Sequence, residues 1–119
     1  MRNMSFAMTT QQVRDRTKTV TRRFGWCFLK PRDRVQAVEK AQGMAKGEKI
    51  KPLAVIEIVS VRHEPLNEIT KADCIKEGFP DFEPSDFVNM LTEHYRADPD
   101  QIVNRIEFKY IKVRPEAVE

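Results

Sequence analysis

Hydrophobic and polar residues alternate along several short segments of the chain, with the period of two that is typical of β-strands. The clearest case is residues 102–111, where apolar side chains such as Ile106 alternate with charged ones such as Arg105. We expect the apolar set to face the core and the charged set to face solvent. The same kind of pattern predicts three shorter strands, at residues 4–8, 17–22 and 34–39.

A fifth strand is predicted at residues 53–61, which are almost continuously apolar and β-branched, as in a central strand. Three short helices are expected around these strands, over residues 10–16, over residues 71–76 with an end at Gly78, and over about 84–94. Long helical crossovers between strands are mostly missing from this order. The pattern therefore favours an α+β domain around a curved or barrel-like sheet rather than a doubly wound one.

The length and composition agree with one globular domain. The chain has 119 residues, with 40% hydrophobic and 33% charged residues. We expect a single domain over residues 1–113 and a tail over 114–119. The sequence has neither an apolar stretch long enough to cross a bilayer nor the features of a signal peptide, and Cys27 and Cys74 lie far apart. We therefore expect a cytoplasmic protein with two reduced thiols and no membrane partner.

The net charge of +3 conceals an uneven distribution. Residues 1–34 contain nine Lys or Arg and two Asp, whereas the remaining residues contain twelve basic and sixteen acidic side chains. Such segregation suggests a positive face directed at phosphate or carboxylate groups. The alternative is that the positive third of the chain only neutralises the negative two-thirds within the fold.

The most specific signal is the segment Lys-Thr-Val-Thr-Arg-Arg, which begins at Lys18 and ends at Arg23. Its cations, which include Arg22, suit phosphate or carboxylate, and Thr19 and Thr21 add hydroxyl groups. Neighbouring cations lower one another's pKa, so Lys18 is a candidate base and Thr21 a candidate nucleophile. The alternative is an edge strand whose cations prevent aggregation. The pattern leaves both interpretations open.

Two residues near this segment have a functional and a structural interpretation. Trp26, after Arg23, could stack on a nucleic-acid base, although a Trp in such a position is more often a core residue. Glu77, at the end of the second helix, could act as a general acid or base if it faces Lys18, although most such glutamates are solvated. His63 and His94 are isolated from each other, so we expect no metal site, and no motif indicates a cofactor.

Together, these segments resemble the ASCH domain family. The matching pieces are residues 16–23, similar to the family's G-x-K-T-x-T-x-R, residues 29–33, similar to its turn K-x-G-D, and residues 77–79 and 105–109. The motifs are most similar to those of small phage- and prophage-type ASCH proteins. The resemblance implies a PUA-like β-barrel of about five to six strands with two or three short helices.

The same resemblance implies a ligand that is RNA, a nucleotide or a modified nucleoside. A small bacterial branch of the family hydrolyses N4-acetylcytidine, and its catalytic residues would fall on Lys18 as base, Thr21 as nucleophile and Glu77 as proton donor. Other members are reported as ribonucleases. By this resemblance Thr19, Arg22, Arg23 and Trp26 would bind the ligand.

The sequence also departs from the family pattern. The glycine before the Lys-Thr motif is replaced by Arg16 or Thr17, and the turn glycine by Arg32. Three functions therefore remain open: binding of RNA or a modified nucleoside, with or without hydrolysis; a dedicated amidohydrolase; and a phage-encoded protein that binds a host protein through the acidic C-terminal half. The oligomeric state is not predicted.

Overall fold

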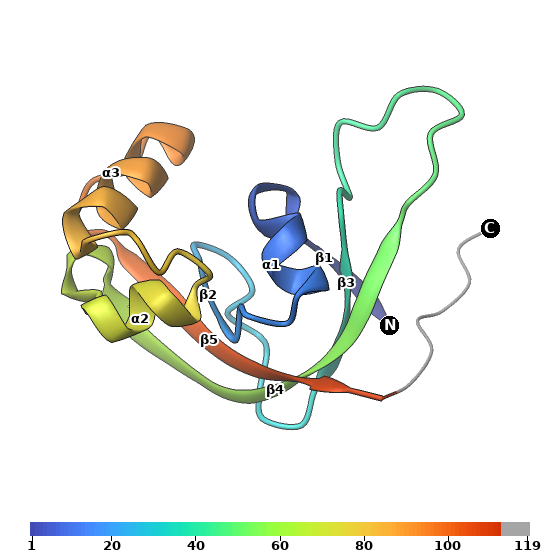
Figure 1. Cartoon of the computed structure of the whole chain (residues 1–119), viewed down its shortest axis with the longest axis horizontal. Coiled ribbons are helices and arrows are strands. Elements are labelled where there is room, and N and C mark those ends of the chain that lie inside the picture. The colour runs from blue at the N-terminus through green and yellow to red at the C-terminus, as the bar shows by residue number, and fades with distance from the viewer. Residues whose placement is uncertain (113–119) are drawn as a thin grey trace.

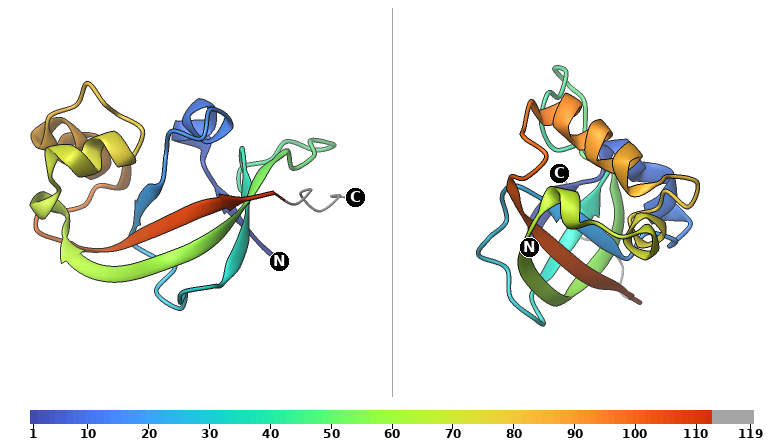
Figure 2. Two further views of the ribbon diagram at one scale, coloured as in Figure 1. Left: turned by 60° about the horizontal axis from the view of Figure 1, so that its bottom comes forward. Right: turned by 90° about the vertical axis from the view of Figure 1, so that its left-hand side faces the viewer.

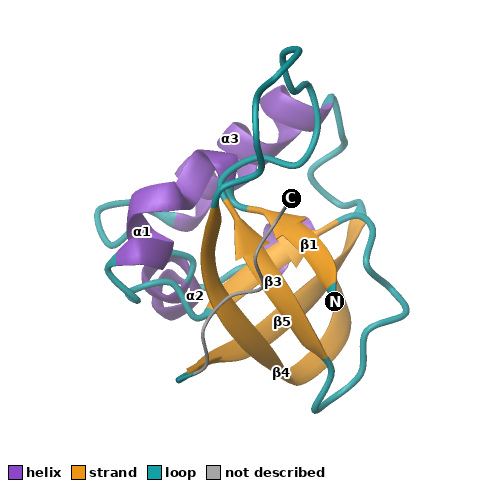
Figure 3. Cartoon of the chain, turned by 90° about the vertical axis from the view of Figure 1, so that its right-hand side faces the viewer, coloured by secondary structure: helices purple, strands orange, loops and turns teal. Residues whose placement is uncertain are grey.

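Five strands form one curved mixed sheet in the order β1-β3-β4-β5-β2, in which β1 is parallel to β3 and the other neighbours are antiparallel. The computed structural model describes residues 1–112, and the expected tail lies outside the described residues. The strands are β1 (Arg2–Ser5), β2 (Val20–Arg23), β3 (Arg34–Val38), β4 (Pro52–Pro65) and β5 (Ile102–Ile111). The long strands β4 and β5 bend strongly, so the sheet forms a half-barrel with β1 and β2 at its two edges (Figures 1 and 3).

The three α-helices lie on the concave side of this sheet (Figures 1 and 2). They are α1 (Thr10–Arg14), α2 (Lys71–Lys76) and α3 (Pro84–Tyr95), with 3-10 turns at Ala7–Thr9 (η1) and Leu66–Glu68 (η2). Helix α1 sits near the middle of the concave side, whereas α2 and α3 cover the far ends of β4 and β5.

The helix that leads into the site begins and ends as its sequence predicts. The Thr70 hydroxyl accepts a hydrogen bond from the backbone N–H of Asp73 at 3.2 Å, which caps α2. Gly78 has a φ of +96°, a left-handed conformation that ends the helix directly after Glu77. Glu77 is thus held at the C-terminal end of α2, where it meets β2.

Two hydrophobic clusters hold the layers together. The first fills the half-barrel beneath α1, and the second lies beneath α3 at the other end of β4 and β5. The first cluster contains Met4, Phe6, Val13, Leu29, Val35, Ala37, Ile56, Ile58, Ile106 and Phe108, and the second contains Leu66, Ile69, Cys74, Phe87, Val88, Leu91 and Val103.

The structure corrects several expected details. The first strand is Arg2–Ser5 rather than residues 4–8, because the chain turns into η1 after Phe6. The helix α1 ends at Arg14, and Arg16 takes a left-handed φ of 61°. The strand expected at 17–22 is regular only over Val20–Arg23. The charged face expected for β5 is wrong at Arg105, which is buried, because α2 covers that end of the strand with a carboxylate.

Candidate active site

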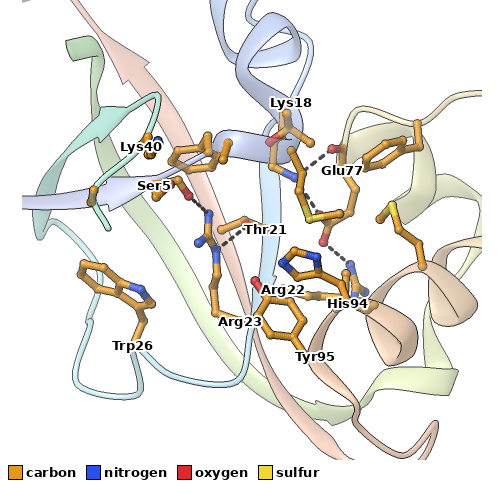
Figure 4. A pocket seen from close by; sticks show the side chains of 18 of the residues that line it. Ser5, Lys18, Thr21, Arg22, Arg23, Trp26, Lys40, Glu77, His94 and Tyr95 are labelled. Atoms are coloured by element: carbon orange, nitrogen blue, oxygen red, sulfur yellow. Dashed lines mark hydrogen bonds and ion pairs between the residues drawn. The ribbon is translucent and has the colours of Figure 1, made fainter. Parts of the chain in front are cut away.

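A cavity of about 520 Å³ opens on the concave side between β1, β2, the end of α2 and one face of α3 (Figure 4). Of the seven residues that the sequence suggested for the site, six line this cavity: Lys18, Thr21, Arg22, Arg23, Trp26 and Glu77. Thr19 does not line it, and the backbone of Thr19 instead bonds to Lys76 and Phe108. The segment before and within β2 therefore forms one wall of the cavity.

Lys18 and Glu77 form a buried ion pair at the bottom of the cavity. Lys18 Nζ donates to Glu77 Oε1 and to the Glu77 carbonyl oxygen, both at 2.8 Å. The side chains are only 3% and 2% exposed. The Tyr110 hydroxyl donates to the Lys18 carbonyl at 2.6 Å, and burial raises the pKa of Tyr110 to about 12, so that this donor stays protonated. The ammonium is thus fixed from both its backbone and its head group.

Burial lowers the pKa of Lys18, because the interior disfavours the charged form. The attraction of Glu77 opposes this effect, and the nearby guanidinium groups of Arg23 and Arg22 add to it. Lys18 therefore loses its proton more easily than an ordinary lysine does. The sequence predicted a lowered pKa for Lys18, and the direction is confirmed. Its main cause is burial rather than the neighbouring cations.

Arg22 links Glu77 to a second set of buried charges. Its Nη1 donates to Glu77 Oε2 at 3.1 Å, and its Nη2 donates to Glu64 at 3.1 Å and to Asp73. Arg105 donates two hydrogen bonds to the same Asp73, at 2.7 and 3.0 Å. Arg105, followed by Arg22, holds the pKa of the Asp73 carboxyl far below its usual range. This cluster holds Glu77 Oε2, and Lys18 holds Oε1, so both oxygens of Glu77 are fixed.

Thr21 lies between Arg23 and the Lys18–Glu77 pair (Figure 4). Its hydroxyl oxygen accepts a hydrogen bond from Arg23 Nε at 2.9 Å. Arg23 Nη2 also donates to the carbonyl oxygen of Ser5 at 2.7 Å, which joins the edge strand β2 to the end of β1. Because the guanidinium occupies one lone pair of Thr21, the hydroxyl hydrogen is left to point toward another acceptor.

The interpretation of this segment as a solvated protective edge is wrong for its two best-placed cations. β2 does lie at an edge of the sheet, but Lys18 and Arg22 are buried and each is bonded to carboxylates. Trp26 is half-buried against the first hydrophobic cluster and also lines the cavity, and its stacking on a base stays a prediction.

Some residues that face β2 across the cavity were not predicted from the sequence. His94 and Tyr95 reach it from the last turn of α3 (Figure 4). The apolar stripe of α3 continues to these positions, and that periodicity is the signal that could have placed them here. Asp73 and Arg105 had no such signal, since each looked like a surface charge.

Three further features of the described residues concern metal ligands, cysteines and membrane-spanning helices. In residues 1–112, no group of three His, Cys, Asp or Glu side chains could hold a metal ion. Cys27 is exposed, Cys74 is buried, and both are free. No helix in that part of the chain is long and apolar enough to span a bilayer.

Solved structures with a similar fold include two bacterial proteins. One is a protein of Enterococcus faecalis V583 with the family description DUF984, at a TM-score of 0.66 and 17% identity, covering 93% of this chain and 76% of that one. The other is an ASCH domain from Lactobacillus crispatus JV V101, at a TM-score of 0.61 and 16% identity, covering 91% and 77%. No family model and no curated protein sequence matches the chain. The likeness confirms the α+β, PUA-like fold of ASCH domains.

Proposed function

We propose that the cavity binds a modified nucleoside and hydrolyses an acyl amide on its base, as the resemblance to N4-acetylcytidine amidohydrolases implies. The observation that carries this proposal is the buried Lys18–Glu77 pair, with both contacts at 2.8 Å, in a cavity that Thr21 also lines. Amide hydrolysis requires a nucleophile, a base and a proton donor for the leaving amine. These three side chains supply all three.

The cavity has the size and lining of a small-molecule site. Its volume of about 520 Å³ lies within the common range of roughly 300–1,000 Å³ for ligand pockets. The rings of Trp26 and Tyr95 line it and offer flat surfaces to a base. An RNA chain needs cations on an open surface, whereas Lys18 and Arg22 are buried and paired with acids. A single nucleoside therefore fits the site better than a strand does.

The proposed reaction starts from the neutral pair, in which a proton has moved from Lys18 Nζ to Glu77 along their hydrogen bond. The Lys18 amine takes the hydroxyl proton of Thr21, and Oγ1 bonds to the amide carbonyl carbon. The carbon–nitrogen bond then breaks as Glu77 gives its proton to the leaving amine. The acyl group is now an ester of Thr21, and the pair has become ammonium and carboxylate.

Water completes the cycle. It attacks the ester carbon and loses a proton to Glu77, and the bond to Thr21 Oγ1 breaks as that oxygen takes a proton from Lys18. The carboxylic acid leaves, and the neutral pair returns. Arg22 keeps Glu77 in place throughout, through its bond to Oε2 at 3.1 Å. Arg23 favours the attacking alkoxide of Thr21, because its charged N–H already bonds that oxygen at 2.9 Å.

The test is the release of cytidine from N4-acetylcytidine, measured by mass spectrometry. Thr21→Val removes the hydroxyl at nearly constant shape, and we expect kcat/KM to fall by about a thousandfold or more. Thr19→Val is the matched control, because Thr19 lies two residues away and does not line the cavity; its rate should stay unchanged. Absence of turnover by the unaltered protein, or a Thr21→Val rate within tenfold of it, would exclude this function.

RNA and a host protein remain predicted partners. An RNA complex should weaken steeply with added salt, because phosphate contacts release counterions. A host-protein complex through the acidic half should instead survive the double substitution of Arg22 and Arg23 by Ala.

A further inference from the structure

Among the described residues, Arg23 is the cation of the cavity that makes no ion pair, although the more distant Glu77 still attracts it. Its contacts are the Thr21 hydroxyl at 2.9 Å, the Ser5 carbonyl at 2.7 Å and the Phe6 ring at 4.8 Å, all of them neutral groups. Within residues 1–112, Arg23 makes no ion pair, whereas Lys18 and Arg22 are bonded to carboxylates. A half-buried guanidinium keeps its charge, so a site that leaves it unpaired is suited to an anionic ligand.

In the part of the chain that the structure describes, the rest of this end of the cavity is also free of acids. Among residues 1–112, four cationic side chains line the whole cavity, and Glu77 is the one residue with a carboxylate in the lining. Lys40 lies on the Arg23 side together with Trp26, away from Glu77 (Figure 4). The contact of Lys40 with Glu48 spans 3.4 Å between partly exposed side chains, and such pairs contribute little. Lys40 can therefore exchange Glu48 for a ligand at small cost.

From these contacts we infer that the Arg23–Lys40 end of the cavity is a phosphate subsite, so that the ligand is a nucleotide rather than a free nucleoside. Arg23 Nη1 has no hydrogen-bond partner in the described part of the chain, and a guanidinium edge matches phosphate oxygens. The inference rests on the proposed function for the identity of the base end. It adds the phosphate, which comes from a free nucleotide or from an RNA chain.

Direct binding tests the subsite without relying on turnover. Isothermal titration calorimetry with cytidine and with cytidine 5′-monophosphate (CMP) compares ligands that differ only in the phosphate. We expect CMP to bind about tenfold or more tightly, because each charge-assisted hydrogen bond to phosphate is stronger than a neutral one. The trinucleotide ApCpA, which has internal phosphates alone, distinguishes the source. Tight CMP with weak ApCpA indicates a free nucleotide, and ApCpA at least equal to CMP indicates RNA.

Two lysine substitutions in one loop provide the matched pair. Lys40→Met should lower the CMP-to-cytidine affinity ratio by about threefold or more, since it removes one of the two cations. Lys46→Met changes an exposed lysine that does not line the cavity, and its ratio should stay that of the unaltered protein. Arg23→Gln, which retains an amide N–H donor, should remove most of the preference, provided that its thermal unfolding remains cooperative.

The outcomes separate this inference from the proposed hydrolysis. Equal affinities for CMP and cytidine, or binding of neither, would overturn the phosphate subsite. A Lys46→Met effect as large as that of Lys40→Met would do the same, because the preference would then reflect overall charge. Hydrolysis of N4-acetylcytidine in either of those cases would leave the proposed function standing.

Discussion

Single residues build the site as a connected set of buried charges, from Lys18 through Glu77 and Arg22 to Asp73 and Arg105. The sequence allowed the first contact to be predicted, since a carboxylate at a helix end and a lysine before a strand could meet. It did not allow the Asp73–Arg105 contact to be predicted. The alternation of side chains along the strand predicts that Arg105 faces solvent. Only the three-dimensional position of α2 shows that this face of the sheet is covered.

Asp73 is the residue whose removal should affect stability most clearly. Its pKa is lowered on folding, so its contribution to the free energy of unfolding is complete above the unfolded value of about 3.9 and is lost as the pH falls below it. Asp73→Asn should reduce the free energy of unfolding by about 2–4 kcal/mol at pH 7, because Arg105 loses a buried partner.

Urea unfolding at pH 7 and pH 3 measures this effect. The difference between the unaltered protein and Asp73→Asn should shrink at the lower pH, and Asp100→Asn, at an exposed position, should show no such difference. A difference independent of pH would contradict the assignment of the stabilisation to the Asp73 carboxylate.

Lys18 should give the reaction its pH dependence. The reactive pair holds one proton, which Glu77 must give to the leaving amine, so kcat/KM should fall as the pH rises through the pKa of Lys18 and that proton is lost. Because burial lowers this pKa, the midpoint should fall below 10.5, the ordinary value for lysine. A pH–rate profile on N4-acetylcytidine measures it, and a midpoint at or above the ordinary value would contradict the role of a buried base.

At the scale of elements, the junction between α2 and the site depends on one glycine. Gly78 has a φ of +96°, and a Cβ at this position would lie 2.7 Å from Gln12 Cγ and 2.9 Å from Gln12 Cβ. Gln12 belongs to α1 and also donates from Nε2 to the Gly78 carbonyl at 3.2 Å. The turn that carries Glu77 is therefore packed directly on α1.

Gly78→Ala should destabilise the protein by about 2–3 kcal/mol, because it combines a strained backbone with a steric clash. Gly43→Ala is the matched control: Gly43 has a φ of +66°, but an added Cβ would have no atom within 4 Å among the described residues, so we expect about 1 kcal/mol. Thermal or urea unfolding measures both. Equal losses would show that Gln12 moves aside easily.

The sequence predicted the type and order of the elements, but some bounds depend on pairing that it does not encode locally. β1 ends at Ser5 because the chain must leave its parallel register with β3 there, and the Phe6 N–H makes a last bond to the Val38 carbonyl at 2.9 Å. The apolar run of β4 looked fully buried, but its register with β5 shifts between Ile58 and Ser60 and leaves Val59 42% exposed. The local sequence pattern contains no signal for the end of β1 or for the register shift in β4.

At the scale of the whole molecule, the half-barrel holds an open cavity between two independently packed clusters. Ligand binding should bridge them and stabilise the fold. With ligand at a hundred times its Kd, the free energy of unfolding should rise by about 2.7 kcal/mol. For a domain of this size, that corresponds to roughly 10 °C or more in Tm.

The single tryptophan allows ligand binding and the stabilisation that it causes to be measured together. Trp26 lines the cavity, so its fluorescence should report ligand binding and thermal unfolding together. CMP is the probe expected to give both changes. An unchanged Tm at a concentration that saturates the fluorescence signal would show that the ligand binds elsewhere or also binds the unfolded chain.

The position of β2 in the sheet also bears on how the protein is made. β2 has β5 as its neighbour, so residues 20–23 can pair only after residues 104–107 have left the ribosome. At about 5–20 residues per second, the strand waits several seconds after its own synthesis. During that time Lys18 and Arg22 remain in water, at no cost in desolvation. We therefore expect the nascent chain to expose a positively charged segment, and the pairing of β2 with β5 that helps to bury these charges to follow the synthesis of β5.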